Sequence, residues 1–194
     1  GTDINAERVA EIAGGVDKTG ELSSDELARV IGNGLNVTDK ISAMTDCNVY
    51  IITVPTPVDI DNIPDLTPLR DASRSVASVL RPGDTVIYES TVYPGATEEE
   101  CVPLLEEGSG LRYNLDFHVG YSPERVNPGD REHRVENISK ITSGSSAEAA
   151  DFVDRLYASV LKAPTFRAAS IKTAEAAKIL ENTQRDINIA FINE

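Results

Sequence analysis

The 194-residue sequence has few cysteines and no long hydrophobic run. Its two cysteines, Cys47 and Cys101, stand apart among apolar neighbours without the spacing of metal ligands. We therefore expect no metal site, and buried, reduced thiols of the kind found in cytoplasmic proteins. No stretch approaches the roughly 18 apolar residues of a membrane-spanning helix, and residues 1–5 lack the features of a secretory signal. These absences favour a cytoplasmic protein without a membrane span.

Basic residues are also few. The sequence has 18 Lys and Arg and 32 Asp and Glu, which gives a formal net charge of -14. A strongly acidic protein repels nucleic acid and anionic membranes, so we expect neither as a partner. The same charge disfavours a diphosphate ligand unless helix N-termini and a few basic side chains build a local anion site. Screening over about 8 Å at physiological salt separates such a site from distant acids.

Apolar runs of strand length alternate with helical patterns along the chain. Strands are expected at residues 48–54, 85–89, 116–121, 140–142 and 164–168. Helices are expected at residues 6–12, 67–80, 147–161 and 170–194, after Ser23 or Ser24, and from Thr97. The apolar runs do not alternate with polar residues, as is typical of strands buried on both faces of a parallel sheet. This order of elements predicts an α/β fold with a parallel sheet, followed by a long C-terminal helix.

Asp3 directly precedes the first helix, where a Rossmann fold has an acidic residue at the end of its second strand. That carboxylate binds the ribose hydroxyls of adenosine and repels a 2′-phosphate, which selects NAD. It normally lies about 20 residues after a G-x-G-x-x-G loop, but only two residues precede Asp3. Gly32-Asn33-Gly34 ends a helix and is interpreted as a loop. We therefore expect a Rossmann-like sheet that lacks its first strand and Gly-rich loop, although an Asp here is by default only a helix cap.

Polar segments close three of the expected strands. They are Val-Pro-Thr-Pro at residues 54–57, Glu-Ser-Thr-Val-Tyr-Pro-Gly at residues 89–95 and Tyr-Ser-Pro-Glu-Arg-Val-Asn-Pro-Gly at residues 121–129. Ligands of α/β proteins bind at the carboxyl ends of strands, so these segments are candidate site elements. Taken singly, Thr91 is by default a turn residue and Glu124 a surface acid.

The last helix carries a fourth candidate segment. Lys178, Asn182 and Arg185 have the i, i+4, i+7 spacing of residues on one helix face. Apolar residues lie on the opposite face, namely Leu180, Ile187 and Phe191. Without further context, the polar face is a solvated helix surface.

Taken together, the four segments resemble the UDP-sugar 6-dehydrogenases over essentially the whole chain. The segments at residues 89–95, 121–129 and 181–186 are specific as a set, whereas Val-Pro-Thr-Pro alone is weak. In the glucose-oxidising branch, an apolar Phe-Leu pair follows the glutamate that matches Glu124, but this sequence has Arg125-Val126. The resemblance is therefore closest to the branch that oxidises UDP-N-acetylhexosamines for surface polysaccharides, which includes the Vi-antigen type.

This resemblance implies an NAD-dependent oxidation of the sugar C6 alcohol to a carboxylate. Two NAD+ are reduced, and a cysteine holds the intermediate first as a thiohemiacetal and then as a thioester that water hydrolyses. Asp3 and Arg8 would contact the adenosine side of NAD, and Thr56 would lie beside the cofactor. Thr91 would lie at the nicotinamide and the catalytic water, as both a cofactor-binding and a catalytic residue.

The resemblance also implies roles for the remaining candidates. Glu124 would be the general base for thioester hydrolysis, and Lys178 and Asn182 would hold the oxyanion and the water. These roles suit the residue types, because a carboxylate can take a proton from water and fixed donors stabilise negative charge on oxygen. Arg125 and Arg185 would join these three residues in binding the substrate.

The sequence departs from the family in one respect that affects the whole reaction. The nucleophilic cysteine of the family follows the Lys/Asn helix in a Gly-Gly-His-Cys-like segment, and neither Cys47 nor Cys101 matches it. We expect residues 1–168 to form an NAD-binding domain and residues 169–194 to begin a long central helix that supports a homodimer. The UDP-binding domain would be absent, and the chain alone would be inactive.

Two alternative functions remain open from the sequence. The first is another Rossmann dehydrogenase with a Lys-x-x-x-Asn helix, of the 3-hydroxyacid or 6-phosphogluconate type, which the Ser-Pro-Glu-Arg segment disfavours. The second is a non-catalytic nucleotide-binding or assembly module. The sequence does not distinguish the gluco from the galacto substrate.

Overall fold

The computed structural model describes residues 1–124 and 137–193. Its α-helices are α1 (Ala6–Ala13), α2 (Ser24–Gly32), α3 (Thr67–Ala77), α4 (Val102–Ser109), α5 (Ala147–Ala158) and α6 (Ile171–Asn193). A 3-10 turn, η1 (Ile41–Met44), precedes the first strand, and a π-helical turn, η2 (Thr97–Cys101), leads into α4. The strands are β1 (Val49–Ile52), β2 (Thr85–Tyr88), β3 (His118–Tyr121), β4 (Lys140–Gly144) and β5 (Thr165–Arg167). Each expected strand and helix is present, and η1 was not predicted.

The strands form one sheet in the order β1-β2-β3-β4-β5. The first three are parallel, and Tyr88 at the end of β2 pairs with Ile52 of β1 and Tyr121 of β3. Their carboxyl ends therefore lie at one edge of the sheet. β4 runs antiparallel to β3, whereas β5 is parallel to β4. The sequence predicted a parallel sheet and missed this reversal, because the residues of a strand do not encode the direction of its neighbour.

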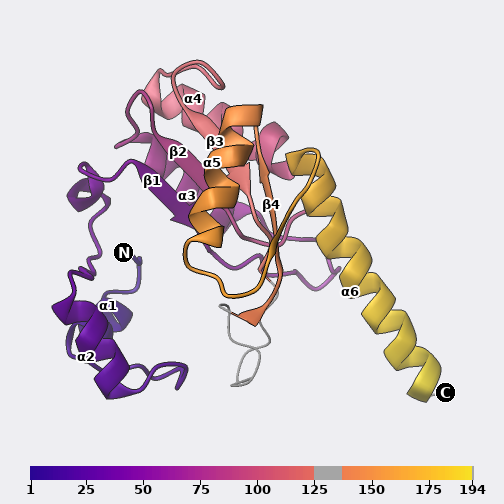
Figure 1. The fold of residues 1–194 in the computed structure, drawn as a ribbon, viewed down its shortest axis with the longest axis horizontal. Coiled ribbons are helices and arrows are strands. Elements are labelled where there is room, and N and C mark those ends of the chain that lie inside the picture. The colour runs from indigo at the N-terminus through magenta and orange to yellow at the C-terminus, as the bar shows by residue number, and fades with distance from the viewer. Residues whose placement is uncertain (125–136, 194) are drawn as a thin grey trace.

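Both faces of the sheet are covered by helices, as the continuous apolar runs indicated (Figure 1). Val86 and Tyr88 of β2 pack in the larger core, which contains residues of α3, α4 and the start of α6. Ile87 points to the other face and packs against Val153 and Tyr157 of α5. A Cβ on Gly120 of β3 would come within 2.6 Å of the Val153 side chain, so glycine is needed for the close approach of α5.

The two ends of the chain lie on opposite sides of the sheet (Figure 1). At one side, α1 begins with a cap in which the Asn5 side chain accepts hydrogen bonds from two backbone N–H groups, and Ser23 and Glu26 form a capping box at α2. At the other side, only the first turns of α6 are buried, and its C-terminal half extends into solvent. The predicted apolar face of this helix is exposed, with Leu180 at 69% and Phe191 at 81%.

Candidate functional site

Three predicted site residues follow the carboxyl ends of adjacent parallel strands. Thr56 comes after β1, Thr91 after β2 and Glu124 after β3. Hydrogen bonds join these strand ends, because Ser90 Oγ donates to the Val54 carbonyl at 2.6 Å and the Tyr121 hydroxyl donates to the Ser90 carbonyl at 3.2 Å. Thr91 is exposed, whereas Thr56 and Glu124 are half-buried. The structure therefore brings the three segments to one edge of the sheet.

The hydroxyl of Thr56 is a buried polar group that lacks a hydrogen-bond partner among the described residues. Its Oγ1 is buried and makes no hydrogen bond to any residue within 1–124 and 137–193. A buried hydroxyl without a partner costs about 1–3 kcal/mol, and three other side-chain atoms of the described residues, on Arg8, Thr97 and His118, are in the same situation. The orphaned hydroxyl fits the expected position of Thr56 beside a bound cofactor.

The start of α6 is fastened to the segment that contains Thr91. The Glu175 carboxylate is fully buried and accepts hydrogen bonds from the backbone N–H groups of Gly95, at 2.5 Å, and Thr97, at 2.9 Å. Lys178 and Asn182 follow on the next two turns of the helix and are half-buried. Glu175 therefore sets the position of the predicted Lys/Asn face, a role that its sequence environment did not reveal.

Arg185 lies further along α6 and is exposed. Its guanidinium lies 3.4 Å from the Glu181 carboxylate, a pair within one helix turn. The predicted substrate contact of Arg185 therefore has no support in the contacts of the described residues. Arg125, the other arginine assigned to the substrate, lies outside the described residues.

A buried cation lies between the ends of the strands that carry the site. The Lys140 ammonium on β4 is 3.3 Å from Glu89 Oε2 and 3.7 Å from Glu124 Oε2. The Tyr157 hydroxyl of α5 donates to the second oxygen of Glu89, and the Lys140 nitrogen lies 5.0 Å from the Tyr157 ring centre. The sequence did not indicate Lys140 and Tyr157 as site residues, because each lies in a segment with the pattern of an ordinary strand or helix.

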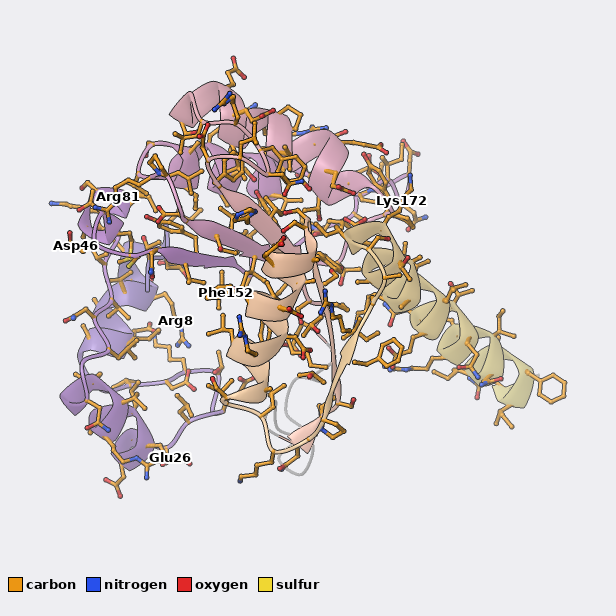
Figure 2. The ribbon with its side chains drawn as sticks, turned by 45° about the horizontal axis from the view of Figure 1, so that its top comes forward. Arg8, Glu26, Asp46, Arg81, Phe152 and Lys172 are labelled. Carbon is orange, nitrogen blue, oxygen red and sulfur yellow. The ribbon has the colours of Figure 1, made fainter. Side chains whose placement is uncertain are left out.

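Asp3 and Arg8, the predicted adenosine contacts, lie on the side of the molecule that carries α1 and α2. Asp3 is exposed, and its carboxylate accepts a 2.8 Å hydrogen bond from the backbone N–H of Asn5. The Arg8 guanidinium donates to Asp17 at 2.7 Å. Hydrogen bonds from Thr19 and from Arg8 hold the pKa of the Asp17 carboxyl well below its usual value. Figure 2 shows Arg8 on the opposite side of the molecule from Lys172, which marks the start of α6.

The two cysteines are free thiols, but burial was predicted for both and only Cys101 is buried. Cys101 in η2 is fully buried, and burial raises the pKa of its thiol to about 11. Cys47 is half-buried beside Met44. Cys101 therefore has the properties of a core residue.

Within 1–124 and 137–193, no group of three or more His, Cys, Asp and Glu side chains is arranged to hold a metal ion. No helix in this part of the chain is both long enough and apolar enough to span a bilayer. A cavity of about 490 Å³ lies between residues 144–147 and 167–171, and it contains none of the predicted site residues.

Known proteins resemble this chain along its whole length. The sequence profile described as "UDP-glucose/GDP-mannose dehydrogenase family, NAD binding domain" matches residues 1–161. The UDP-N-acetyl-D-glucosamine 6-dehydrogenases of Pseudomonas aeruginosa and Salmonella typhi are 58% and 55% identical over 194 residues. All of this chain is covered, but only 46% and 45% of those proteins. The chain thus spans about half the length of these curated relatives.

Solved structures show the same relationship. The structure of a UDP-D-ManNAc dehydrogenase from Pyrococcus horikoshii superposes with a TM-score of 0.91 at 41% identity, covering 100% of this chain and 46% of that one. A GDP-mannose dehydrogenase from Pseudomonas aeruginosa gives a TM-score of 0.90 at 24% identity and supports the fold alone.

Proposed function

Since this chain belongs to the UDP-glucose/GDP-mannose dehydrogenase family and carries its NAD-binding domain, we propose that the full-length protein oxidises a UDP-N-acetylhexosamine at C6 with NAD+. The family resemblance, the Rossmann-like α/β fold and the choice of NAD were predicted from the sequence and are confirmed. The substrate rests on one observation, the 58% and 55% identity to enzymes named for UDP-N-acetyl-D-glucosamine.

The catalytic residues of the proposal are Thr91, Glu124, Lys178 and Asn182. NAD+ supplies the hydride acceptor for both oxidations. Lys178 and Asn182 stabilise the negative charge that develops on the substrate oxygen as hydride leaves. Glu124 takes a proton from the water that completes the reaction, and Thr91 orients groups at the nicotinamide. The Glu175 contacts support this arrangement, because they tie the helix of Lys178 to the segment of Thr91.

The cofactor extends, in this proposal, from the N-terminal helices to the strand ends. Asp3 and Arg8 hold the adenosine side, and Thr56 uses its orphaned hydroxyl on the cofactor. The position of Arg8 at the far side from α6 supports an extended cofactor (Figure 2). The Asp3 carboxylate favours NAD over NADP, because it repels a 2′-phosphate.

The proposal also covers the substrate contacts and the assembly of the protein. Arg125 and Arg185 complete the contacts to the UDP-sugar together with Glu124, Lys178 and Asn182. A homodimer forms through α6, and the exposed apolar residues on its outer half support this contact. We also place the protein in the cytoplasm, where its free thiols suit a reducing compartment.

The test is a substrate panel with the full-length protein. UDP-N-acetylglucosamine, UDP-N-acetylgalactosamine, UDP-glucose, a 3-hydroxyacid and 6-phosphogluconate are each supplied with NAD+, and NADH is followed by absorbance. We expect two NADH for each UDP-N-acetylhexosamine and faster turnover than with UDP-glucose. Preferential oxidation of a small hydroxyacid or of 6-phosphogluconate would overturn the proposal. No oxidation of any substrate would favour the non-catalytic module.

A further inference from the structure

Lys140 is a lysine in the sheet interior, with a side chain only 6% exposed. An ammonium in such a place loses its hydration and needs compensating charges and hydrogen bonds. The compensation comes from three other parts of the fold, namely the segment after β2, the segment after β3, and α5. Lys140 therefore contacts several elements at once, and these contacts indicate its role.

One of the two carboxylates beside Lys140 is mostly buried. The Glu89 side chain is 12% exposed, lies 3.3 Å from the ammonium and also accepts the Tyr157 hydroxyl. This carboxylate is the nearer of the two to the Lys140 ammonium. In this buried pair, Lys140 contacts one oxygen of Glu89 and the Tyr157 hydroxyl donates to the other, so both carboxylate oxygens have partners.

The second carboxylate is in a different environment. Glu124 lies 3.7 Å from the ammonium through Oε2, and its side chain is 41% exposed. The Lys140 ammonium also lies 3.5 Å from the carbonyl oxygen of Pro123, the residue before Glu124. Lys140 thus contacts both the backbone and the side chain of the segment after β3. Glu124 contacts Lys140 and stays partly exposed to solvent, which suits a group that must act on a water molecule.

We propose that Lys140 is a positioning residue that holds the Glu124 carboxylate at the strand ends, with Glu89 and Tyr157 fixing Lys140 itself. The inference rests on the proposed role of Glu124 as general base. A glutamate has several freely rotating bonds, and an ammonium fixed in the core limits the orientations that its carboxylate adopts. Misplacement of a reacting group by about 1 Å can cost about 10²-fold in rate.

The test uses full-length protein and avoids an unpaired buried charge. Lys140→Met together with Glu89→Gln removes both members of the buried pair, so that neither charge is left unpaired while Glu124 loses its contact with Lys140. We expect the first NADH burst to stay within about threefold of the unmutated protein and steady-state turnover to fall about 10- to 100-fold. Lys140→Arg keeps the charge and should restore most of the turnover. Lys172→Met removes an exposed lysine of α6 that pairs with Glu99, and should change neither rate.

A double-mutant cycle separates positioning from general stabilisation. If Lys140 acts through Glu124, the Lys140→Met/Glu89→Gln pair should slow a Glu124→Gln enzyme by less than about twofold further. A loss that multiplies with Glu124→Gln, or steady-state turnover unaffected by the Lys140 change, would overturn the proposal.

Crystal structures of the unmutated and the Lys140→Met/Glu89→Gln proteins provide a readout that does not depend on activity. A Glu124 carboxylate that leaves its place in the variant supports the positioning role, and one that stays there overturns it. If the unmutated protein oxidises no UDP-sugar, the proposed function fails on its own, and this comparison still decides the role of Lys140.

Discussion

The Glu175 carboxylate accepts a 2.9 Å hydrogen bond from the backbone N–H of Thr97, at the beginning of the helical segment that continues into α4. The first N–H groups of a helix have no partners within the helix, and a carboxylate at that end is favoured by the helix dipole. Glu175 belongs to a different helix, α6, so this contact joins two elements distant in the sequence. It fixes α6 against the segment that closes β2.

Replacing Glu175 with Gln should therefore destabilise the fold. The amide keeps the shape but loses the charge and presents an N–H₂ group toward backbone donors. We expect the free energy of unfolding to fall by about 2–3 kcal/mol, measured by urea denaturation. Glu99→Gln is the matched control, because Glu99 is an exposed partner of Lys172 and should change stability by less than about 0.5 kcal/mol. Equal stability of the two variants would contradict the structural role of Glu175.

Cys101 should resist thiol reagents in the folded protein. Burial raises the pKa of its thiol to about 11, and the thiolate is the reactive form. At pH 8 about one Cys101 in a thousand would be ionised, and that fraction should rise as the pH approaches 11. Iodoacetamide labelling with peptide mass spectrometry should modify the half-buried Cys47 first. Both cysteines should react in urea, and rapid native labelling of Cys101 would show that η2 opens.

Asp3→Ala should narrow the preference for NAD over NADP in the full-length protein. Loss of the ribose hydrogen bonds should weaken NAD about tenfold, whereas NADP gains from the removal of a repelling charge. Steady-state kinetics with both cofactors measures the ratio. Asp25→Ala, in the exposed first turn of α2, serves as a control. An unchanged ratio would mean that Asp3 only organises the start of α1 through its bond to Asn5.

Glu124→Gln and Lys178→Ala should fail at different steps. Lys178→Ala should slow the reaction about 10²–10³-fold from the first hydride transfer, as expected for the loss of an oxyanion donor. Glu124→Gln should still give a rapid burst of NADH and then stall as a covalent thioester, because the amide cannot take a proton from water. Rapid-mixing absorbance and intact-protein mass spectrometry distinguish the two. Absence of both the burst and the adduct in Glu124→Gln would place Glu124 earlier in the reaction.

The strands and helices were predictable from local sequence to within a few residues. Val86-Ile87-Tyr88 is a continuous apolar run, and all three residues are buried as the pattern indicated. The spacing of Lys178, Asn182 and Arg185 predicted one polar face of α6, but the structure leaves Lys178 and Asn182 half-buried and Arg185 exposed. The predicted parallel direction of β4 was wrong, since the direction of a strand depends on which strand lies beside it. The roles assigned to the site residues stay predictions.

Sequence by itself determined the elements of this protein, because hydrophobic periodicity and helix caps act over a few neighbouring residues. It also indicated the family, through the resemblance of four segments to the UDP-sugar 6-dehydrogenases, and the family profile confirms it. Tertiary structure alone decided that Lys140 lies buried between Glu89 and Glu124, and that Glu175 binds the backbone of Thr97. The physical reason is that the environment of a charged side chain is set by groups brought to it from distant parts of the chain, which no local pattern records.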